Sequence, residues 1–302
     1  MFIIRNRKFF YSLSILLVGA SIIALSIWGL TPGIDFRGGS IIEVEYASRP
    51  TVDSVNTALS GLKLGAYSVR ETGDAGYIIR TDELTPSLHD AVLNTLSDGG
   101  KVSLTEKRFN SIGPVLGKEA IQKAWMSIAL VLLAIILFIT FAFRKVSRPV
   151  SSWKYGLIAV IALAHDVIIP AGVFSVLGHY AGFEIDTLFV TALLVILGFS
   201  IHDTIVVFDR VRENLHRNTE YHEKKEFDTI VGESINQTFV RSINTSLTTL
   251  LAIAVLYVLG PDATKHFSLA LLIGLTVGTY SSIFIGSPLL VTWQKWQERK
   301  NK

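Results

Sequence analysis

Residues 197–214, LGFSIHDTIVVFDRVREN, decide how this chain folds, because a long apolar run carries an acid here before it gives way to charged residues. The run covers residues 188–208 and is 21 residues long, close to the roughly 20 residues with which an α-helix crosses a bilayer core. On insertion scales a central Asp costs about 2.5–3.5 kcal/mol, whereas each Leu, Ile, Val or Phe contributes about 0.3–0.6 kcal/mol in favour. The apolar residues outweigh the acid, so the run predicts a transmembrane helix with Asp203 at membrane depth.

The composition places the whole chain in the membrane class. Of its 302 residues 50% are hydrophobic, and the mean hydropathy is +0.45, which is more than one soluble domain needs. The chain has no cysteine, which excludes disulfides, thiolate nucleophiles and cysteine-ligated metal centres. Its sequence has no phosphate-binding loop motif. We therefore expect a polytopic membrane protein that is not an enzyme and has neither a cofactor nor a nucleic-acid partner.

Six apolar runs predict six transmembrane helices. The first run is uncharged over 22 residues, which exceeds the roughly 7–15 residues of a signal-peptide core and predicts a span that stays in the protein. The predicted spans are residues 9–30, 124–143, 156–177, 188–208, 242–259 and 267–293.

The polar segment 31–123 predicts a separate domain between the first two spans. Its apolar spacing follows the order β-α-β-β-α-β, which is typical of the ferredoxin-like fold. The predicted fold class is a polytopic α-helical membrane protein with six transmembrane helices and an external α+β ferredoxin-like domain. The predicted parts are residues 1–30 (cytoplasmic tail and first helix), 31–123 (external domain), 124–296 (five-helix bundle) and 297–302 (cytoplasmic tail).

Lysine and arginine are distributed unevenly between the loops. The N-terminal tail, the loops around residues 144–154 and 210–241, and the C-terminal tail are rich in them, whereas the short loops 178–187 and 260–266 carry only Lys265. By the positive-inside rule the basic loops face the cytoplasm. We therefore expect both termini to be cytoplasmic and residues 31–123 to be external.

Ionisable side chains within the spans are the candidate functional residues, because such groups are costly in lipid and are kept for a purpose. The third span carries His165 and Asp166, the fourth His202 and Asp203, and Arg241 lies at the edge of the fifth. We interpret these five residues as candidates for a proton pathway.

Each candidate also has a simpler interpretation. Asp203 could join helices through hydroxyl groups, and Asp166 could cap the backbone that Pro170 frees four residues later. His165 and His202 each precede an acid, which would suit a metal-dependent hydrolase, but neighbouring residues on a helix point about 100° apart. We prefer proton handling for Asp203 because an ionisable acid is an expensive means of joining helices.

A polar stripe accompanies Arg241 in the fifth span. Asn244, Thr245 and Thr248 follow it at helical spacing, and in the fourth span Ser200 shares a face with Asp203. We expect the two stripes to face each other and to enclose a wet path. Snorkelling of Arg241 to the interface is the alternative.

Five longer motifs give the chain a family resemblance. They occur in family order along the whole chain, and the fourth is the longest and most specific. The motifs are GIDFRGGS (33–40), IGPVLGKEA (112–120), ALAHDVIIP (162–170), GFSIHDTIVVFDRVREN (198–214) and TFVRSINTSLTTL (238–250). The chain thus resembles the SecF branch of the SecD–SecF protein-export family, within the RND transporter superfamily.

The resemblance implies a function and a set of partners. It implies a multi-pass protein of the bacterial cytoplasmic membrane that uses the proton motive force to assist preprotein translocation. The implied partners are a separate SecD-like subunit, the SecYEG translocon, unfolded exported preproteins, protons and the lipid membrane. By motif position, Asp203 would be the intramembrane acid and Arg241 the basic residue across from it, while His202 stands where the family often has Asn. A proton-driven RND-type exporter of lipids or small molecules is the alternative.

Overall fold

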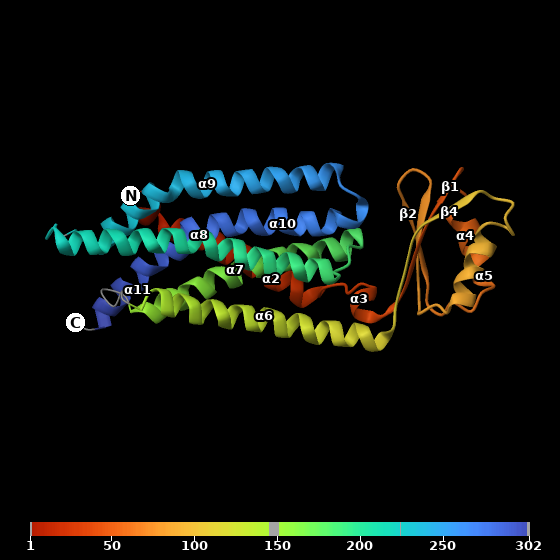
Figure 1. Cartoon of the computed structure of the whole chain (residues 1–302), viewed down its shortest axis with the longest axis horizontal. Coiled ribbons are helices and arrows are strands. Elements are labelled where there is room, and N and C mark those ends of the chain that lie inside the picture. Colours follow the sequence, from red (N-terminus) through yellow and green to blue (C-terminus); the bar gives the residue numbers. More distant parts are fainter. Residues whose placement is uncertain (1, 145–150, 224, 301–302) are drawn as a thin grey trace. The chain divides into compact units, whose positions relative to one another are not determined.

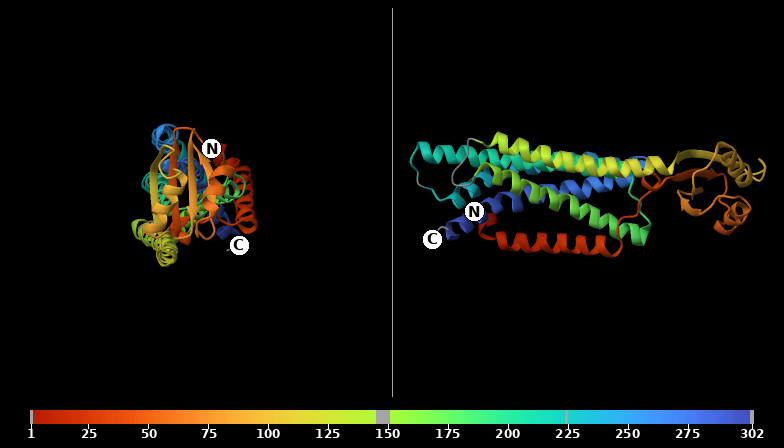
Figure 2. Two further views of the ribbon diagram at one scale, coloured as in Figure 1. Left: turned by 90° about the vertical axis from the view of Figure 1, so that its right-hand side faces the viewer. Right: turned by 90° about the horizontal axis from the view of Figure 1, so that it is seen from below.

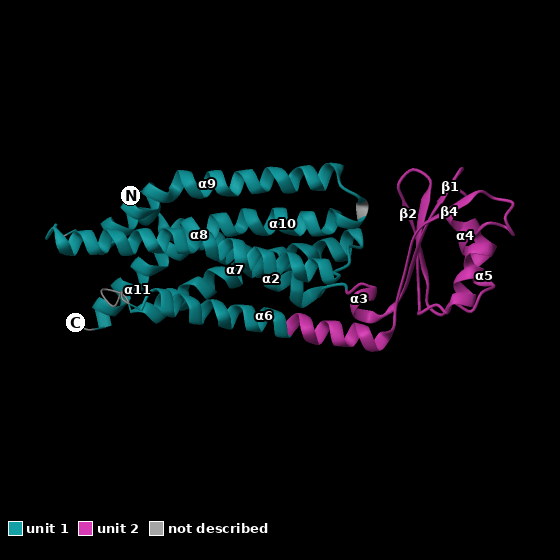
Figure 3. Ribbon diagram, viewed as in Figure 1, with its two compact units in different colours: residues 1–31, 126–302 teal, residues 32–125 magenta. Residues whose placement is uncertain are grey.

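The structure is a computed structural model, and it describes residues 2–144, 151–223 and 225–300. Parts of the basic loop 144–154 and of the tail 297–302, on which the predicted orientation partly rests, lie outside the described residues. The chain divides into two compact units, residues 1–31 with 126–302 and residues 32–125, which Figure 3 shows in two colours.

The first unit is a bundle of long helices (Figure 1). Within the described residues, six helical segments are long and apolar enough to cross a membrane, so the six-span prediction is confirmed. A short helix, α1 (Phe2–Arg5), precedes them. The spanning helices are α2 (Arg7–Ile27), α6 (Pro114–Ala142), α7 (Ser152–Ala181), α8 (Thr187–Glu220), α9 (Phe227–Leu259) and the consecutive segments α10 (Asp262–Ser281), η1 (Ser282–Gly286, a π-helix) and α11 (Ser287–Lys300).

The helices α8 and α9 extend well beyond the apolar runs that predicted them. The fourth run ends at Phe208, but α8 continues to Glu220 because charged side chains one turn apart, such as Arg210 and Glu213 at 2.7 Å, suit an exposed helix surface. The fifth span was predicted from residue 242, whereas α9 begins at Phe227. An apolar run therefore marks the membrane-embedded part of a helix and not its ends.

The bundle has a buried centre and an exposed periphery. About 61% of the most apolar part of α7 and 50% of that of α8 is buried inside the chain, against 6% for α6 and 11% for α9. The views in Figure 2 show α7 within the bundle, with α2 and α6 on different sides of it. Functional groups on α7 and α8 are thus enclosed by protein, while α9 presents most of its surface outward.

The second unit is a four-stranded antiparallel sheet with two helices against one face. The strand order β2-β3-β1-β4 confirms the predicted ferredoxin-like domain. Its core joins strand residues such as Ile42 and Ile79 to Leu59 and Val92 of the helices. The elements are α3 (Ile34–Arg37), β1 (Gly39–Tyr46), α4 (Val52–Ser60), β2 (Ser68–Thr72), β3 (Gly76–Thr81), α5 (Pro86–Leu96) and β4 (Leu104–Ile112).

The first two sequence motifs pack closely against each other at two glycines. Gly38 has a φ of +81°, and a Cβ there would lie 2.7 Å from the Cα of Pro114. A Cβ on Gly117 would lie 2.8 Å from the carbonyl oxygen of Phe36. Only glycine permits this approach, so the segment that opens the second unit is held against the start of α6.

Candidate functional site

The two intramembrane acids are both buried but lie in separate polar clusters. Asp166 is 0% exposed and Asp203 is 3% exposed. His165 and Asp166 belong to one cluster, on α7. Asp203, with His202 beside it on α8 and Arg241 on α9, belongs to the other.

Asp166 is fully hydrogen-bonded. Ser200 of α8 and Ser281 of α10 both donate to its Oδ2 atom, Ser281 over 2.7 Å. The Nδ1 atom of His165 lies 2.9 Å from Oδ1. The carboxylate thus bonds three side chains from three helices. Within the described residues the hydrogen-bond partners of its carboxylate are side chains, so the alternative interpretation, that it caps the backbone near Pro170, is not supported.

Small residues on α10 permit this cluster. A Cβ on Gly278 would lie 3.1 Å from the Cβ of Ser200, so α8 and α10 approach closely here. One turn later the π-helix η1 begins, and its Ser282 bonds the hydroxyl of Thr204 at 3.0 Å. π-Helical turns are frequent at functional sites. The cluster therefore fixes α8 against α7 and α10.

Asp203 has far fewer partners than Asp166. The hydroxyl of Ser246 on α9 donates to its Oδ2 atom over 3.2 Å, and this is its single hydrogen bond within the described residues. His202 and Arg241 contribute to its electrostatic environment. Neither forms an ion pair with it among the described side chains. A buried carboxylate with one neutral donor is incompletely compensated.

The polar stripe of α9 does not face α8 as the sequence suggested. Arg241, Asn244 and Thr248 are exposed. The hydroxyl of Thr245 bonds the backbone oxygen of Arg241 at 2.9 Å, and that of Thr248 bonds the backbone oxygen of Asn244 at 3.1 Å. Within the described residues, the hydroxyl of α9 that reaches Asp203 on α8 belongs to Ser246, which the sequence analysis missed.

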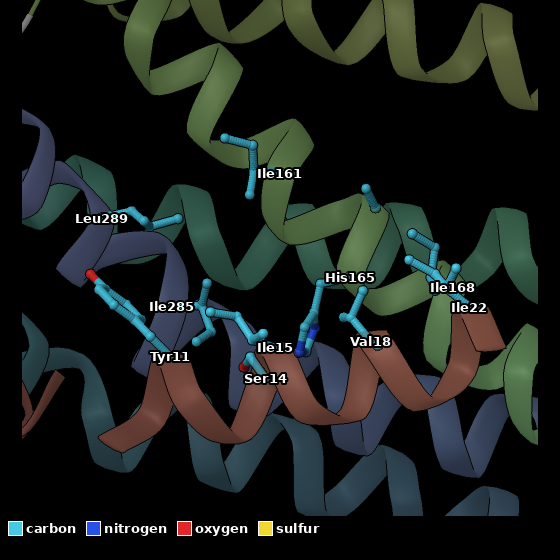
Figure 4. A pocket seen from close by; sticks show the side chains of 12 residues that line it. Tyr11, Ser14, Ile15, Val18, Ile22, Ile161, His165, Ile168, Ile285 and Leu289 are labelled. Atoms are coloured by element: carbon cyan, nitrogen blue, oxygen red, sulfur yellow. The ribbon is translucent and has the colours of Figure 1, made fainter. Parts of the chain in front are cut away.

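The other ring nitrogen of His165 faces an apolar pocket of about 580 Å³ between α2, α7 and the η1–α11 segment (Figure 4). His165 Nε2 and Ser14 Oγ are buried there without a hydrogen-bond partner. The other lining residues are mostly aliphatic, such as Val18 and Ile168. The wet path was expected between α8 and α9. This pocket is apolar and lies between other helices, so it is not that path.

The polar groups of the site are two buried carboxylates and the hydroxyls that bond them. Within the described chain, no group of three His, Asp or Glu side chains is arranged so that it could hold a metal ion. What the bundle offers is one fully bonded acid, one sparsely bonded acid and a set of hydroxyl groups. An acid of the second kind can gain and lose a proton with little rearrangement.

The family comparisons agree on one group of proteins. The family described as "Protein export membrane protein SecD/SecF, C-terminal" matches residues 92–296, and the "SecD/SecF GG Motif" family matches residues 23–48. The chain is 42% identical to "Protein translocase subunit SecF" of Thermobaculum terrenum, covering 97% of this chain and 93% of that protein. The SecF of a Synechocystis species is 36% identical, over 95% of this chain and 92% of that protein.

Solved structures extend the similarity to the fold. The chain superposes on SecDF, a translocon-associated membrane protein from Thermus thermophilus, with a TM-score of 0.81 at 30% identity over 97% of its length. A super-membrane-facing form of SecDF gives a TM-score of 0.69 at 29% identity. The chain spans 38% of the length of the first of these SecDF chains and 39% of the second.

Proposed function

The chain belongs to the SecD/SecF family as a SecF subunit of the Sec protein-export machinery, and we propose that it uses the proton motive force through Asp203. It is a multi-pass protein of the cell membrane. The observation that carries the proposal is the contrast in bonding between the two buried acids. Among the residues that the structure describes, Asp166 has three side-chain partners and Asp203 has one.

The proposed step is an alternation of Asp203 between its protonated and ionised forms. Protonation removes the charge that Ser246 alone does not compensate, whereas ionisation requires a further donor or water. A charge that crosses the membrane potential yields about 2.3 kcal/mol per 100 mV. That energy is enough to bias a movement of α8 against its neighbours, and the Asp166 cluster, with His165, would transmit it to α7 and α10.

Arg241 supports a second part of the proposal, a partner subunit. The outward face of α9 carries exposed residues at spacings of three and four, a pattern typical of a helix that packs against another helix. The set begins polar and becomes apolar along α9: Arg241, Asn244, Thr248, Leu251, Val255 and Val258. A guanidinium exposed to lipid is costly. We propose that a SecD-like subunit covers this face and that Arg241 approaches Asp203 in one state of the cycle.

Family membership supports a proposal for the remaining partners and for the orientation. We propose that the chain lies in the bacterial cytoplasmic membrane with both termini cytoplasmic and residues 31–123 external. The external unit would then act on unfolded preproteins as they leave the SecYEG translocon. The uneven distribution of lysine and arginine between the loops supports this orientation.

The experiment compares two acids on the same helix. Asp203→Asn keeps the size of the side chain and removes its charge, and Asp209→Asn makes the same change at an exposed residue that pairs with Arg212. Export of a preprotein is measured in membrane vesicles with and without a proton gradient. We expect Asp203→Asn to lose the stimulation by the gradient and Asp209→Asn to keep it. Full stimulation in Asp203→Asn would refute the proposal.

A further inference from the structure

Three of the five tryptophans gather at one end of the bundle, where α7 begins and α11 ends. The ring centroids of Trp153 and Trp293 are 6.1 Å apart, and those of Trp293 and Trp296 are 6.2 Å apart. Trp153 and Trp296 are 52% and 57% exposed. Exposed indoles at the end of a membrane bundle favour the headgroup region of the bilayer.

A buried lysine lies within this tryptophan cluster. Lys154 is only 7% exposed, and its ammonium group lies 5.6 Å from the ring centre of Trp153 and 5.9 Å from that of Trp293. No carboxylate of the described residues pairs with it, whereas Lys295 on the same end of the bundle bonds Asp228 at 2.7 Å. Aromatic rings attract a cation but compensate its charge less well than an anion does.

The backbone at the same place also favours an anion. Lys154 lies in the first turn of α7, which contains no acid, and the N-cap residue Ser151 makes no side-chain capping bond. The positive end of the helix dipole therefore adds to the charge of the lysine instead of opposing it. An anion bound here would interact favourably with both.

The cluster also contains side-chain groups that lack partners. The indole Nε1 of Trp293 is buried and has no hydrogen-bond acceptor among the described residues. One turn later on α11, the amide oxygen of Gln297 is buried and has no donor among them. An indole N–H can only donate, which suits a phosphate oxygen. An amide can present either its oxygen or its NH₂ group, which suits a headgroup that carries both a phosphate and hydroxyls.

We propose that this end of the bundle binds an anionic phospholipid. Lys154 and the indole N–H of Trp293 hold the phosphate, and the exposed rings of Trp153 and Trp296 flank the glycerol and upper acyl region. The exposed apolar rings favour a lipid over a soluble anion, because a free phosphate would make no use of them.

The test measures binding of phosphatidylglycerol to the purified full chain in mixed micelles, by native mass spectrometry and by the rise in thermal stability, with phosphatidylcholine as the reference lipid. We expect Lys154→Gln to weaken the preference for phosphatidylglycerol about tenfold, the loss expected for one charge-assisted hydrogen bond. Trp293→Phe, which keeps the ring and removes the N–H, has a smaller effect. Lys154→Arg keeps the charge and retains binding, which separates binding from folding.

A matched control lies on α11. Lys300→Gln removes the same charge from an exposed lysine whose ammonium lies 5.3 Å from the ring centre of Trp296. This variant should bind as the unaltered chain does. Equal losses in Lys300→Gln and Lys154→Gln would mean unspecific attraction to charge and would overturn the proposal.

Two further results would also overturn it. If inorganic phosphate stabilises the chain as much as phosphatidylglycerol does, in a manner that requires Lys154, the site takes a soluble anion. If Lys154→Gln binds phosphatidylglycerol normally but no longer co-purifies with its partner subunit, the cluster is a protein interface. Neither result involves Asp203. The proposed phospholipid site can therefore fail while the proposed role of Asp203 stands, and the reverse.

Discussion

The surroundings of Asp166 and Asp203 show that two equally buried acids can be bonded very differently. Both carboxylates are nearly inaccessible, yet Asp166 is held by hydroxyl and imidazole groups from α7, α8 and α10, whereas Asp203 has one hydroxyl from the peripheral helix α9. A fully bonded acid is fixed in one arrangement. A sparsely bonded acid between a buried and an exposed helix can change its protonation and its partners.

The largest effect is expected at Arg241, the cation that we propose approaches Asp203 in one state of the cycle. Arg241→Ala should abolish gradient-dependent export, because no other cation would then meet the ionised acid. Arg241→Lys should impair it although the charge is kept, because lysine lacks the planar fork of arginine. The control is Arg210→Lys, which alters a partly buried arginine paired with Glu213. Normal gradient dependence in Arg241→Ala would show that Asp203 works without it.

The next effect is on stability, and here the change at Asp166 should cost more than the change at Asp203. Asp166→Ala removes three hydrogen bonds, each worth about 0.6 kcal/mol and at most about 1.7 kcal/mol in a membrane bundle. We expect a loss of about 2–3 kcal/mol in the free energy of unfolding, against less than about 1 kcal/mol for Asp203→Ala. Reversible unfolding in detergent measures both. Similar losses would remove the distinction between the clusters.

Smaller effects are expected from the serines that donate to each acid. Ser281→Ala and Ser246→Ala should each cost about 0.6 kcal/mol of stability. Ser246→Ala should in addition shift the pH dependence of gradient-driven export, because Asp203 then keeps no donor among the described residues. Ser281→Ala should leave that dependence unchanged. A shift in Ser281→Ala alone would assign the working proton to Asp166.

The smallest effect is expected at His202. Its side chain is exposed and makes no hydrogen bond among the described residues. His202→Asn should therefore export with unchanged gradient dependence in the same vesicle assay. An inactive variant would show that the imidazole takes part in proton transfer to Asp203.

The fold was predictable because its signals are local. Run length identified six spans, and the order of strand and helix patterns identified the ferredoxin-like unit. The ends of α8 and α9 were not predictable from hydropathy, because a helix continues into water wherever charged residues suit its surface. The break of the last span into α10, η1 and α11 had no such signal either.

The candidate site was only partly predictable, because its distinctions arise from tertiary contacts. The depth of Asp166 and Asp203 in apolar runs identified both acids. It did not show that Ser200 and Ser281 converge on the first, or that within the described chain only Ser246 reaches the second. Threonine hydroxyls on α9 bond their own helix backbone, so a polar stripe in sequence was not a polar interface within the chain.

The central claim is that Asp203, and not Asp166, exchanges a proton in the folded protein. Infrared difference spectroscopy detects protonation of individual carboxyl groups as the pH is varied. The unaltered chain and Asp166→Asn should both show a titrating carboxyl band that is absent in Asp203→Asn. A band that persists in Asp203→Asn and disappears in Asp166→Asn would contradict the account.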